Sequence, residues 1–137
     1  MPFQLLKVVN WSMRMYYQNL FYVCCLFYFG QITSWFALNS QLVWGWWDDK
    51  PILSCIIFGV PSTIMFWYGT RIAYDTMSEL WAPRFLSFGI SYMVFPFLTW
   101  WFLKENMLET KTLICTFLSM LIIAIQIFWP SSPAAVN

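Results

Sequence analysis

Residues 111–129, KTLICTFLSMLIIAIQIFW, carry one charged side chain, that of Lys111, and are otherwise mostly aliphatic or aromatic. Inside this stretch, residues 121–125 form an unbroken apolar run. A strand of a transmembrane barrel would instead alternate apolar and polar residues over segments of about ten residues. About 20 apolar residues are enough to cross a bilayer as a helix. The stretch therefore predicts a membrane-spanning helix and argues against a barrel.

The composition of the whole chain agrees with this prediction. Hydrophobic residues make up 61% of the sequence and charged residues 9%, whereas a soluble domain carries about 25% charged residues. Lys and Arg (7) nearly balance Asp and Glu (6), so the chain has no basic patch for nucleic acid. We expect an integral, multi-pass membrane protein of the cell membrane, or of the inner membrane in a prokaryote, with the lipid bilayer as its first partner.

Three further apolar runs have the length of a membrane-spanning helix. They cover residues 17–38, 51–71 and 82–103. Pro51 and Pro83 suit the first turn of a helix, where the missing N–H costs no hydrogen bond. Together with the last span, these runs predict an all-α four-helix membrane bundle over residues 17–129.

The two ends of the chain differ from the spans. In residues 1–16, apolar side chains recur at helical spacing, namely Phe3, Leu6, Val9, Met13 and Tyr16. This pattern predicts a short helix lying in the membrane interface, and a frayed terminus is the alternative. Residues 130–137 have no charge and no periodicity, which is typical of a flexible tail.

The basic residues divide almost evenly between the two sides of the predicted bundle. One side would carry Lys7, Arg14, Arg71 and Arg84, and the other Lys50, Lys104 and Lys111. The positive-inside rule acts through this difference, and here the two sides differ by one residue. The pattern favours both termini inside, yet it permits insertion in both orientations. An antiparallel homodimer and a subunit of single orientation therefore both stay open.

Polar residues inside the spans are the candidate binding residues. Tyr28, Gln31 and Trp35 follow the i, i+3, i+7 spacing of one helix face. A polar group in hydrocarbon requires a polar partner or a water-filled cavity. Gln31 therefore either lines a ligand cavity or makes an interhelical hydrogen bond worth about 0.6–2 kcal/mol.

Three further residues complete the predicted substrate-binding set. Trp67 is an amphipathic ring inside the second span, and Ser87 is a small polar residue in the third. Arg84 stands near the start of the third span. Its side chain either extends to the lipid headgroups or lies at the mouth of a cavity. In the second case, Glu79 would neutralise it or an anionic ligand would bind it.

The last span carries a stripe of small and polar residues that we expect to form a homodimer contact. The stripe consists of Thr112, Cys115, Thr116 and Ser119. Small residues at this spacing allow the backbones of two helices to approach closely. A contact of this kind would place the fourth spans of two copies side by side.

Residues that carry catalysis are scarce. The chain has no histidine, and its four cysteines form no CxxC pair of the kind found in zinc sites. No cluster of a nucleophile, a base and a metal set is visible. We therefore expect no metal site, no cofactor and no enzymatic activity.

Two segments resemble a known family. Residues 97–126, FLTWWFLKENMLETKTLICTFLSMLIIAIQ, and residues 66–92, FWYGTRIAYDTMSELWAPRFLSFGISY, are similar to spans of the drug/metabolite transporter superfamily. The length and the four spans match its smallest branch, the small multidrug resistance proteins. The resemblance implies a four-helix subunit that pairs as an antiparallel homodimer.

The sequence departs from that family at the residues that carry its mechanism. The family's first-span glutamate, which binds protons and cationic substrates in turn, corresponds to Gln31, and its third-span tryptophan falls near Ser87. A glutamine cannot titrate, so proton-for-drug exchange is not implied. We expect a transporter-like protein that moves a small neutral or weakly polar molecule through a cavity at a dimer interface. The alternative is a non-transporting membrane subunit or scaffold whose polar stripes bind partner transmembrane helices.

Overall fold

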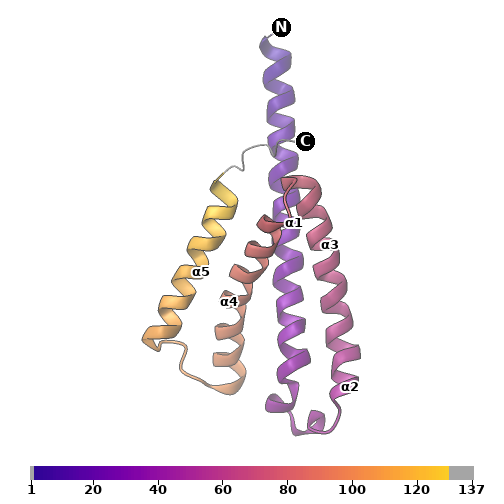
Figure 1. Cartoon of the computed structure of the whole chain (residues 1–137), viewed down its shortest axis with the longest axis vertical. Helices are drawn as coiled ribbons and strands as arrows, with labels where there is room; N and C mark the ends of the chain where they lie inside the picture. Colours follow the sequence, from indigo (N-terminus) through magenta and orange to yellow (C-terminus); the bar gives the residue numbers. More distant parts are fainter. Residues whose placement is uncertain (1, 130–137) are drawn as a thin grey trace.

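The computed structural model describes residues 2–129, with the side chains of residues 11–129. Over this range the chain forms helices and turns and no strand, which confirms the predicted all-α class (Figure 1). The elements are α1 (Pro2–Val43), the 3₁₀ turn η1 (Gly45–Trp47), α2 (Pro51–Ser54), the π-helical turn η2 (Cys55–Gly59), α3 (Val60–Met77), α4 (Trp81–Leu103) and α5 (Thr110–Phe128). The predicted tail at 130–137 lies outside the described residues.

Within the described residues, four helical segments are long and apolar enough to cross a membrane. They cover Trp11–Val43, Pro51–Met77, Trp81–Leu103 and Thr110–Phe128. The last three begin within one residue of their predicted starts. The second segment continues past its predicted end at Arg71 to Met77, and Arg71 pairs with Asp75 one turn later at 3.3 Å. It ends where Ser78 adopts a left-handed conformation with φ of 57°.

The predicted short helix at residues 1–16 is not a separate element. Residues 2–43 form one continuous helix of 42 residues, which is about 63 Å long at 1.5 Å per residue. The sequence has no glycine or proline between Phe3 and Phe29, so nothing interrupts the helix near Tyr16. Figure 1 shows that the N-terminal part of α1 extends well beyond the other helices.

The second segment contains a proline in its interior. Pro61 has no N–H, and its ring would collide with the carbonyl group four residues earlier in a regular helix. The π-helical turn η2 lies directly before it, and the N–H of Val60 donates to the carbonyl oxygen of Cys55. The wider turn makes room for the ring, so that α2, η2 and α3 run on as one rod.

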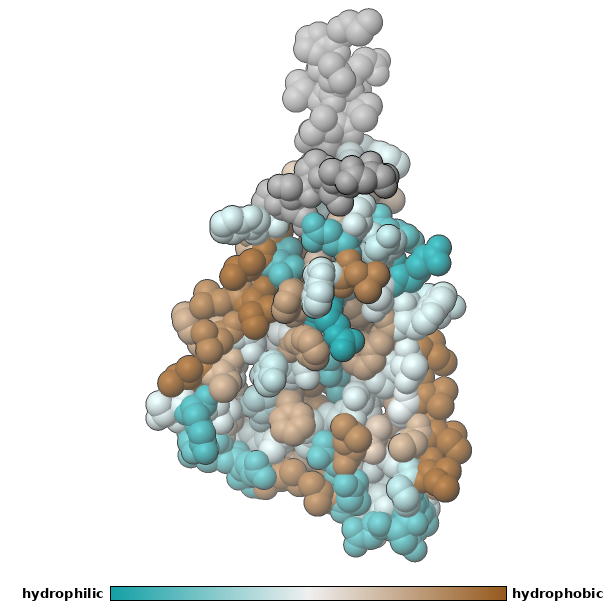
Figure 2. Space-filling view, viewed as in Figure 1, coloured by the Kyte–Doolittle hydropathy of each residue, from teal (hydrophilic) through white to brown (hydrophobic). Residues whose placement is uncertain are grey.

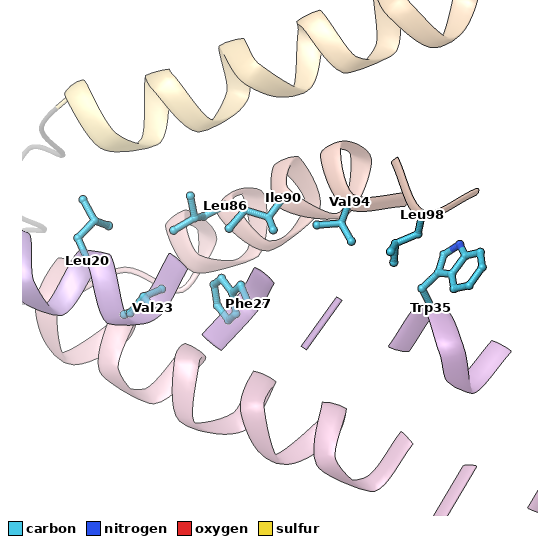
Figure 3. Packing of buried hydrophobic residues seen from close by; sticks show 9 residues of the cluster. Leu20, Val23, Phe27, Trp35, Leu86, Ile90, Val94 and Leu98 are labelled. Carbon is cyan, nitrogen blue, oxygen red and sulfur yellow. The ribbon is translucent and has the colours of Figure 1, made fainter. Parts of the chain in front are cut away.

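The hydrophobic core lies between α1, α3 and α4 (Figure 3). Its buried members are Leu20, Val23, Phe27 and Trp35 of α1, Ala73 of α3, and Leu86, Ile90, Val94 and Leu98 of α4. On α4 they recur at every fourth position, which is the spacing of one helix face. From α5, only the partly buried Ile123 and Ile127 pack against this cluster.

Helices α1 and α3 interlock through two glycines. A Cβ atom at Gly69 would lie 2.6 Å from the ring of Phe27, and one at Gly30 would lie 3.2 Å from the ring of Phe66. Each phenylalanine therefore fills the space above a glycine of the opposite helix. This close approach fixes the register of α1 against α3, and with it the position of the polar residues on α1.

The two ends of the bundle are more hydrophilic than its sides (Figure 2). The connections α1–α2 and α4–α5 lie at one end, and α1 begins at the other (Figure 1). In the α1–α2 connection, Lys50 donates to a carboxylate oxygen of Asp49 at 3.0 Å and lies 4.4 Å from the centre of the Trp46 ring. Its hydrogen bond and its charge lower the pKa of the Asp49 carboxyl group.

Candidate functional site

The side-chain hydrogen bonds between helices all involve α1 among the described residues. They join Asn19 to Thr76, Gly30 to Ser62, Gln31 to Ser87, Trp35 to Thr99, Ala37 to Ser54 and Ser40 to Ser54. In apolar surroundings an unpaired polar group is costly. No buried polar side-chain atom of the described residues lacks a partner. Helix α1 is thus the polar centre of the bundle.

Gln31 bonds to α4 through its side-chain amide. Its Nε2 lies 3.2 Å from the carbonyl oxygen of Ser87 and 3.3 Å from the Ser87 hydroxyl oxygen. This contact brings together two of the predicted site residues. It is the interhelical hydrogen bond that the packing interpretation of Gln31 predicts.

Gln31 also lines two hollows along α4, which together we call the groove between α1 and α4, and α3 adds to the wall of the larger one. The larger, which we call the Arg84 cavity, has a volume of about 440 Å³ and is lined by Gln31, Phe66, Thr70, Leu80, Pro83, Arg84, Ser87, Phe88 and Ser91. The smaller, which we call the Trp35 cavity, has a volume of about 100 Å³ and is lined by Gln31, Ser34, Trp35, Leu38, Asn39, Ser91, Val94 and Phe95. The two cavities share Gln31 and Ser91. Both interpretations of Gln31 therefore find support in its surroundings.

The lining of the two cavities forms a row of polar side chains along the groove. On α4, Arg84, Ser87 and Ser91 follow the i, i+3, i+7 spacing of one helix face. On α1, Ser34 and Asn39 continue the row beyond Gln31. The row runs from the start of α4 past the Gln31–Ser87 contact toward the C-terminal part of α1.

Arg84 is the one charged residue in the lining of either cavity. Its side chain is exposed, and the guanidinium carbon lies 5.1 Å from the centre of the Phe88 ring. Within the part of the chain that the structure describes, Arg84 forms no ion pair, whereas Lys50, Arg71 and Lys111 each pair with a carboxylate. The neutralisation by Glu79 that the sequence suggested is absent.

Two of the predicted binding residues lie away from the cavities. Tyr28 is 45% exposed and Trp67 is 60% exposed, and neither lines the Arg84 cavity or the Trp35 cavity. The buried stripe of α1 passes through Phe27, and Tyr28 lies about 100° further round the helix. Trp35 lies in the buried stripe, and its indole N–H donates to the Thr99 hydroxyl oxygen at 3.2 Å.

The predicted dimer stripe of α5 faces α4 of the same chain at its buried point. Ser119 is buried, and a Cβ atom at Gly89 of α4 would lie 3.2 Å from the Ser119 carbonyl oxygen. Thr112 and Cys115 line a separate cavity of about 270 Å³ between α4 and α5. The hydroxyl of Thr116 donates to the carbonyl oxygen of Thr112 in its own helix. Ser119 therefore contacts α4 of the same chain, whereas Cys115 is exposed, and the homodimer contact of the stripe stays a prediction.

The sequence interpretation missed Ser34, Asn39, Ser91 and Thr99 as members of this region. The spacing of Ser91 from Arg84 and Ser87 was a usable signal for that residue. For Thr99, the signal was absent, because its contact with Trp35 depends on how far α4 is displaced along α1.

Known proteins add no further information on the site. No protein-family model, no curated protein and no solved structure matches this chain.

Proposed function

We propose that the chain is a multi-pass membrane protein of the transporter type, which moves a small, weakly polar molecule along the groove between α1 and α4. The observation that carries this proposal is the pair of cavities that share Gln31 and Ser91. A binding site near the middle of the membrane-spanning region, exposed to one side at a time, is what alternating access requires.

The polar lining supports a path rather than a packing surface alone. Polar side chains in hydrocarbon are costly and mark substrate pathways when they line a cavity. Ser87, Gln31 and Ser91 are partly buried and line the Arg84 cavity. Hydroxyl and amide groups bind a neutral or weakly polar molecule without requiring a charge on it.

The Gln31–Ser87 hydrogen bond is the proposed barrier between the two cavities. A bond of about 0.6–2 kcal/mol is weak enough to open during a transport cycle. A second copy of the chain, placed against the groove, would close its outer side. The proposal therefore includes a homodimer. The antiparallel form is the one that the resemblance to small multidrug resistance proteins implies.

The alternative function is a non-transporting subunit of a membrane complex. The same Gln31–Ser87 contact favours it, because a hydrogen bond between α1 and α4 is useful to packing alone. In that case the two cavities would be packing gaps that water does not enter. Access of water to positions 31 and 91 therefore separates the two functions.

Thiol labelling tests this access directly. The native cysteines are first replaced by alanine, at Cys24, Cys25, Cys55 and Cys115. Gln31→Cys, Ser91→Cys and Ile125→Cys are then introduced singly, and the protein is reconstituted in liposomes. A charged methanethiosulfonate reagent is added from outside, or from both sides. We expect positions 31 and 91 to react.

Ile125 provides the matched control. Its side chain is 53% exposed in the structure, yet it would face acyl chains in a bilayer, where the charged reagent does not enter. We expect position 125 to stay unlabelled. Protection of positions 31 and 91 equal to that of 125 would refute the path and favour the packing subunit. Rapid labelling of 125 would refute the embedding of α5 in lipid.

A further inference from the structure

We infer that the Arg84 cavity binds an amphipathic anion, that is, a carboxylate or phosphate group attached to an apolar body. This inference goes beyond the proposed function: it concerns a ligand held at Arg84, whereas the proposed path carries a neutral or weakly polar molecule past Gln31. Binding to the cavity and passage beyond Gln31 are separate properties, and separate experiments measure them.

The first argument is charge. Arg84 brings one positive charge to the two cavities, and no acidic side chain lines either of them. By contrast, Arg71 lines neither cavity and already pairs with Asp75 at 3.3 Å. A guanidinium group beside apolar walls, without an ion pair among the described residues, favours an anion as its partner.

The second argument is the geometry of the guanidinium group. Arg84 lies over the face of Phe88, with its guanidinium carbon 5.1 Å from the ring centre. Stacking on an aromatic face restricts the side chain while its N–H groups remain able to donate. A planar set of donors matches the two oxygens of a carboxylate or phosphate group better than a single charge does.

The third argument is the remaining wall of the cavity. Phe66, Leu80, Pro83 and Phe88 supply apolar surface, and Thr70, Ser87 and Gln31 supply hydroxyl and amide groups. The volume of about 440 Å³ falls within the range of about 300–1,000 Å³ that is usual for small-molecule sites. An inorganic anion would leave the apolar wall uncovered, whereas an amphipathic one would cover it.

Two sources could supply this chemistry, the headgroup of an anionic phospholipid or a free organic acid. Both would place the acidic group at Arg84, and they differ in where the apolar body comes from. The test therefore uses a free organic acid as the probe and an anionic lipid as its competitor.

The test compares two probes with the same apolar body and opposite charge. The full chain is reconstituted in phosphatidylcholine nanodiscs, and the binding of 1-naphthoate and of 1-naphthylmethylammonium is measured by equilibrium dialysis against empty nanodiscs. We expect 1-naphthoate to bind about tenfold more tightly than the cation, because only the carboxylate can accept the hydrogen bonds that the Arg84 guanidinium group donates. Equal binding of the two probes would overturn the inference.

Three variants locate the binding. Arg84→Gln is expected to lose the preference for the anion, and Arg84→Lys to keep most of it, which shows that the loss does not come from misfolding. Arg71→Gln is the matched control, because Arg71 is exposed, paired with Asp75 and absent from the cavity lining. Unchanged anion binding in Arg84→Gln, or an equal loss in Arg71→Gln, would refute the site.

Addition of phosphatidylglycerol to the nanodiscs then identifies the source. Displacement of 1-naphthoate from the wild type supports the site and assigns it to a bilayer lipid. Binding that persists supports the site and assigns it to a free organic acid. Anion binding together with protected positions 31 and 91 would keep this site and reject the transport path, so the two proposals can fail independently.

Discussion

Helices α1 and α5 are held in the molecule by different means. Every interhelical side-chain hydrogen bond among the described residues involves α1, while the hydroxyls of Thr116 and Ser119 on α5 bond back to their own helix. Helix α4 buries eight of its residues, whereas α5 buries Ser119 alone. The comparison shows a polar, interlocked unit of α1, α3 and α4, with α5 attached to one side by close packing.

Because α5 is attached by packing alone, it is the helix that we expect to move most easily and to offer a face to a partner. Helix α5 contacts the rest of the bundle mainly through α4, and its opposite face exposes Ile114, Leu118, Leu121 and Ile125. Separating α5 from α4 would lose packing contacts, but it would break no interhelical side-chain hydrogen bond among the described residues. The following substitutions test the two kinds of attachment, beginning with the largest expected effect.

The interlock of α1 and α3 is the strongest attachment. We expect Gly69→Val to lower the free energy of unfolding by about 3 kcal/mol, because overpacking a tight contact forces side chains and backbone to shift. The Cβ of the new residue would meet the Phe27 ring at 2.6 Å. Unfolding of the purified protein by sodium dodecyl sulfate measures the change.

Gly45→Val is the control for this substitution. A Cβ atom at Gly45 meets nothing within 4 Å, so the free energy of unfolding should change little. Similar losses in the two variants would mean that valine itself, rather than the contact with Phe27, is destabilising.

The contact between α4 and α5 should be weaker and local. Gly89→Ala places a Cβ 2.6 Å from Ile123 and 3.2 Å from the Ser119 carbonyl oxygen, and we expect a loss of about 1–2 kcal/mol. Hydrogen–deuterium exchange should become faster in α5 and stay unchanged in α1. Faster exchange throughout the bundle would contradict the separate attachment of α5. Gly59→Ala, whose nearest neighbours are 3.9 Å away, serves as the control.

A matched pair of threonines separates a hydroxyl bonded between helices from one bonded within its own helix. Thr99→Val removes the acceptor of the Trp35 indole N–H, and we expect it to cost about 1 kcal/mol. Thr116→Val removes a hydroxyl that bonds within α5 and should cost clearly less in the same unfolding assay. Equal costs would mean that the Trp35–Thr99 bond does not stabilise the bundle.

The smallest effect is expected on the outer face of α5. Leu118 is 51% exposed, and Leu118→Ala should change the free energy of unfolding by no more than about 0.5 kcal/mol. A larger loss that depends on protein concentration would show that a second copy covers this face. The homodimer contact would then lie on the face opposite to the predicted stripe.

Much of the fold was predictable because it follows from hydrophobic length and from proline. The starts of the last three apolar helices were placed within one residue, and Pro51 and Pro83 mark the first turns of two of them. The continuity of α1 was missed, although the absence of glycine and proline between Phe3 and Phe29 was visible in the sequence. The first span was predicted to end at residue 38, whereas residues 39–41 lie inside α1.

The site was predictable in part. Gln31, Ser87, Arg84 and Trp35 were named from polarity inside a span, and the structure places all four along the α1–α4 groove. Tyr28 was named from its spacing to Gln31 and Trp35, and Trp67 from its residue type, and the helix rotation places both outside the groove. The partner of the α5 stripe could not be inferred, because small residues allow close approach of any helix and do not specify which one.

The length of α1 has a consequence for how the molecule would sit in a bilayer. A rod of about 63 Å could lie wholly within a hydrocarbon layer about 30 Å thick only if it leaned by about 60°, beyond the range of about 0–40° found for spanning helices. Helix α1 has 42 residues against 23 in α4, so about 28 Å of it has no counterpart in α4. If α1 stands upright beside α4, its N-terminal part would project from the lipid. Trp11 and Arg14 would then lie toward the aqueous compartment on that side.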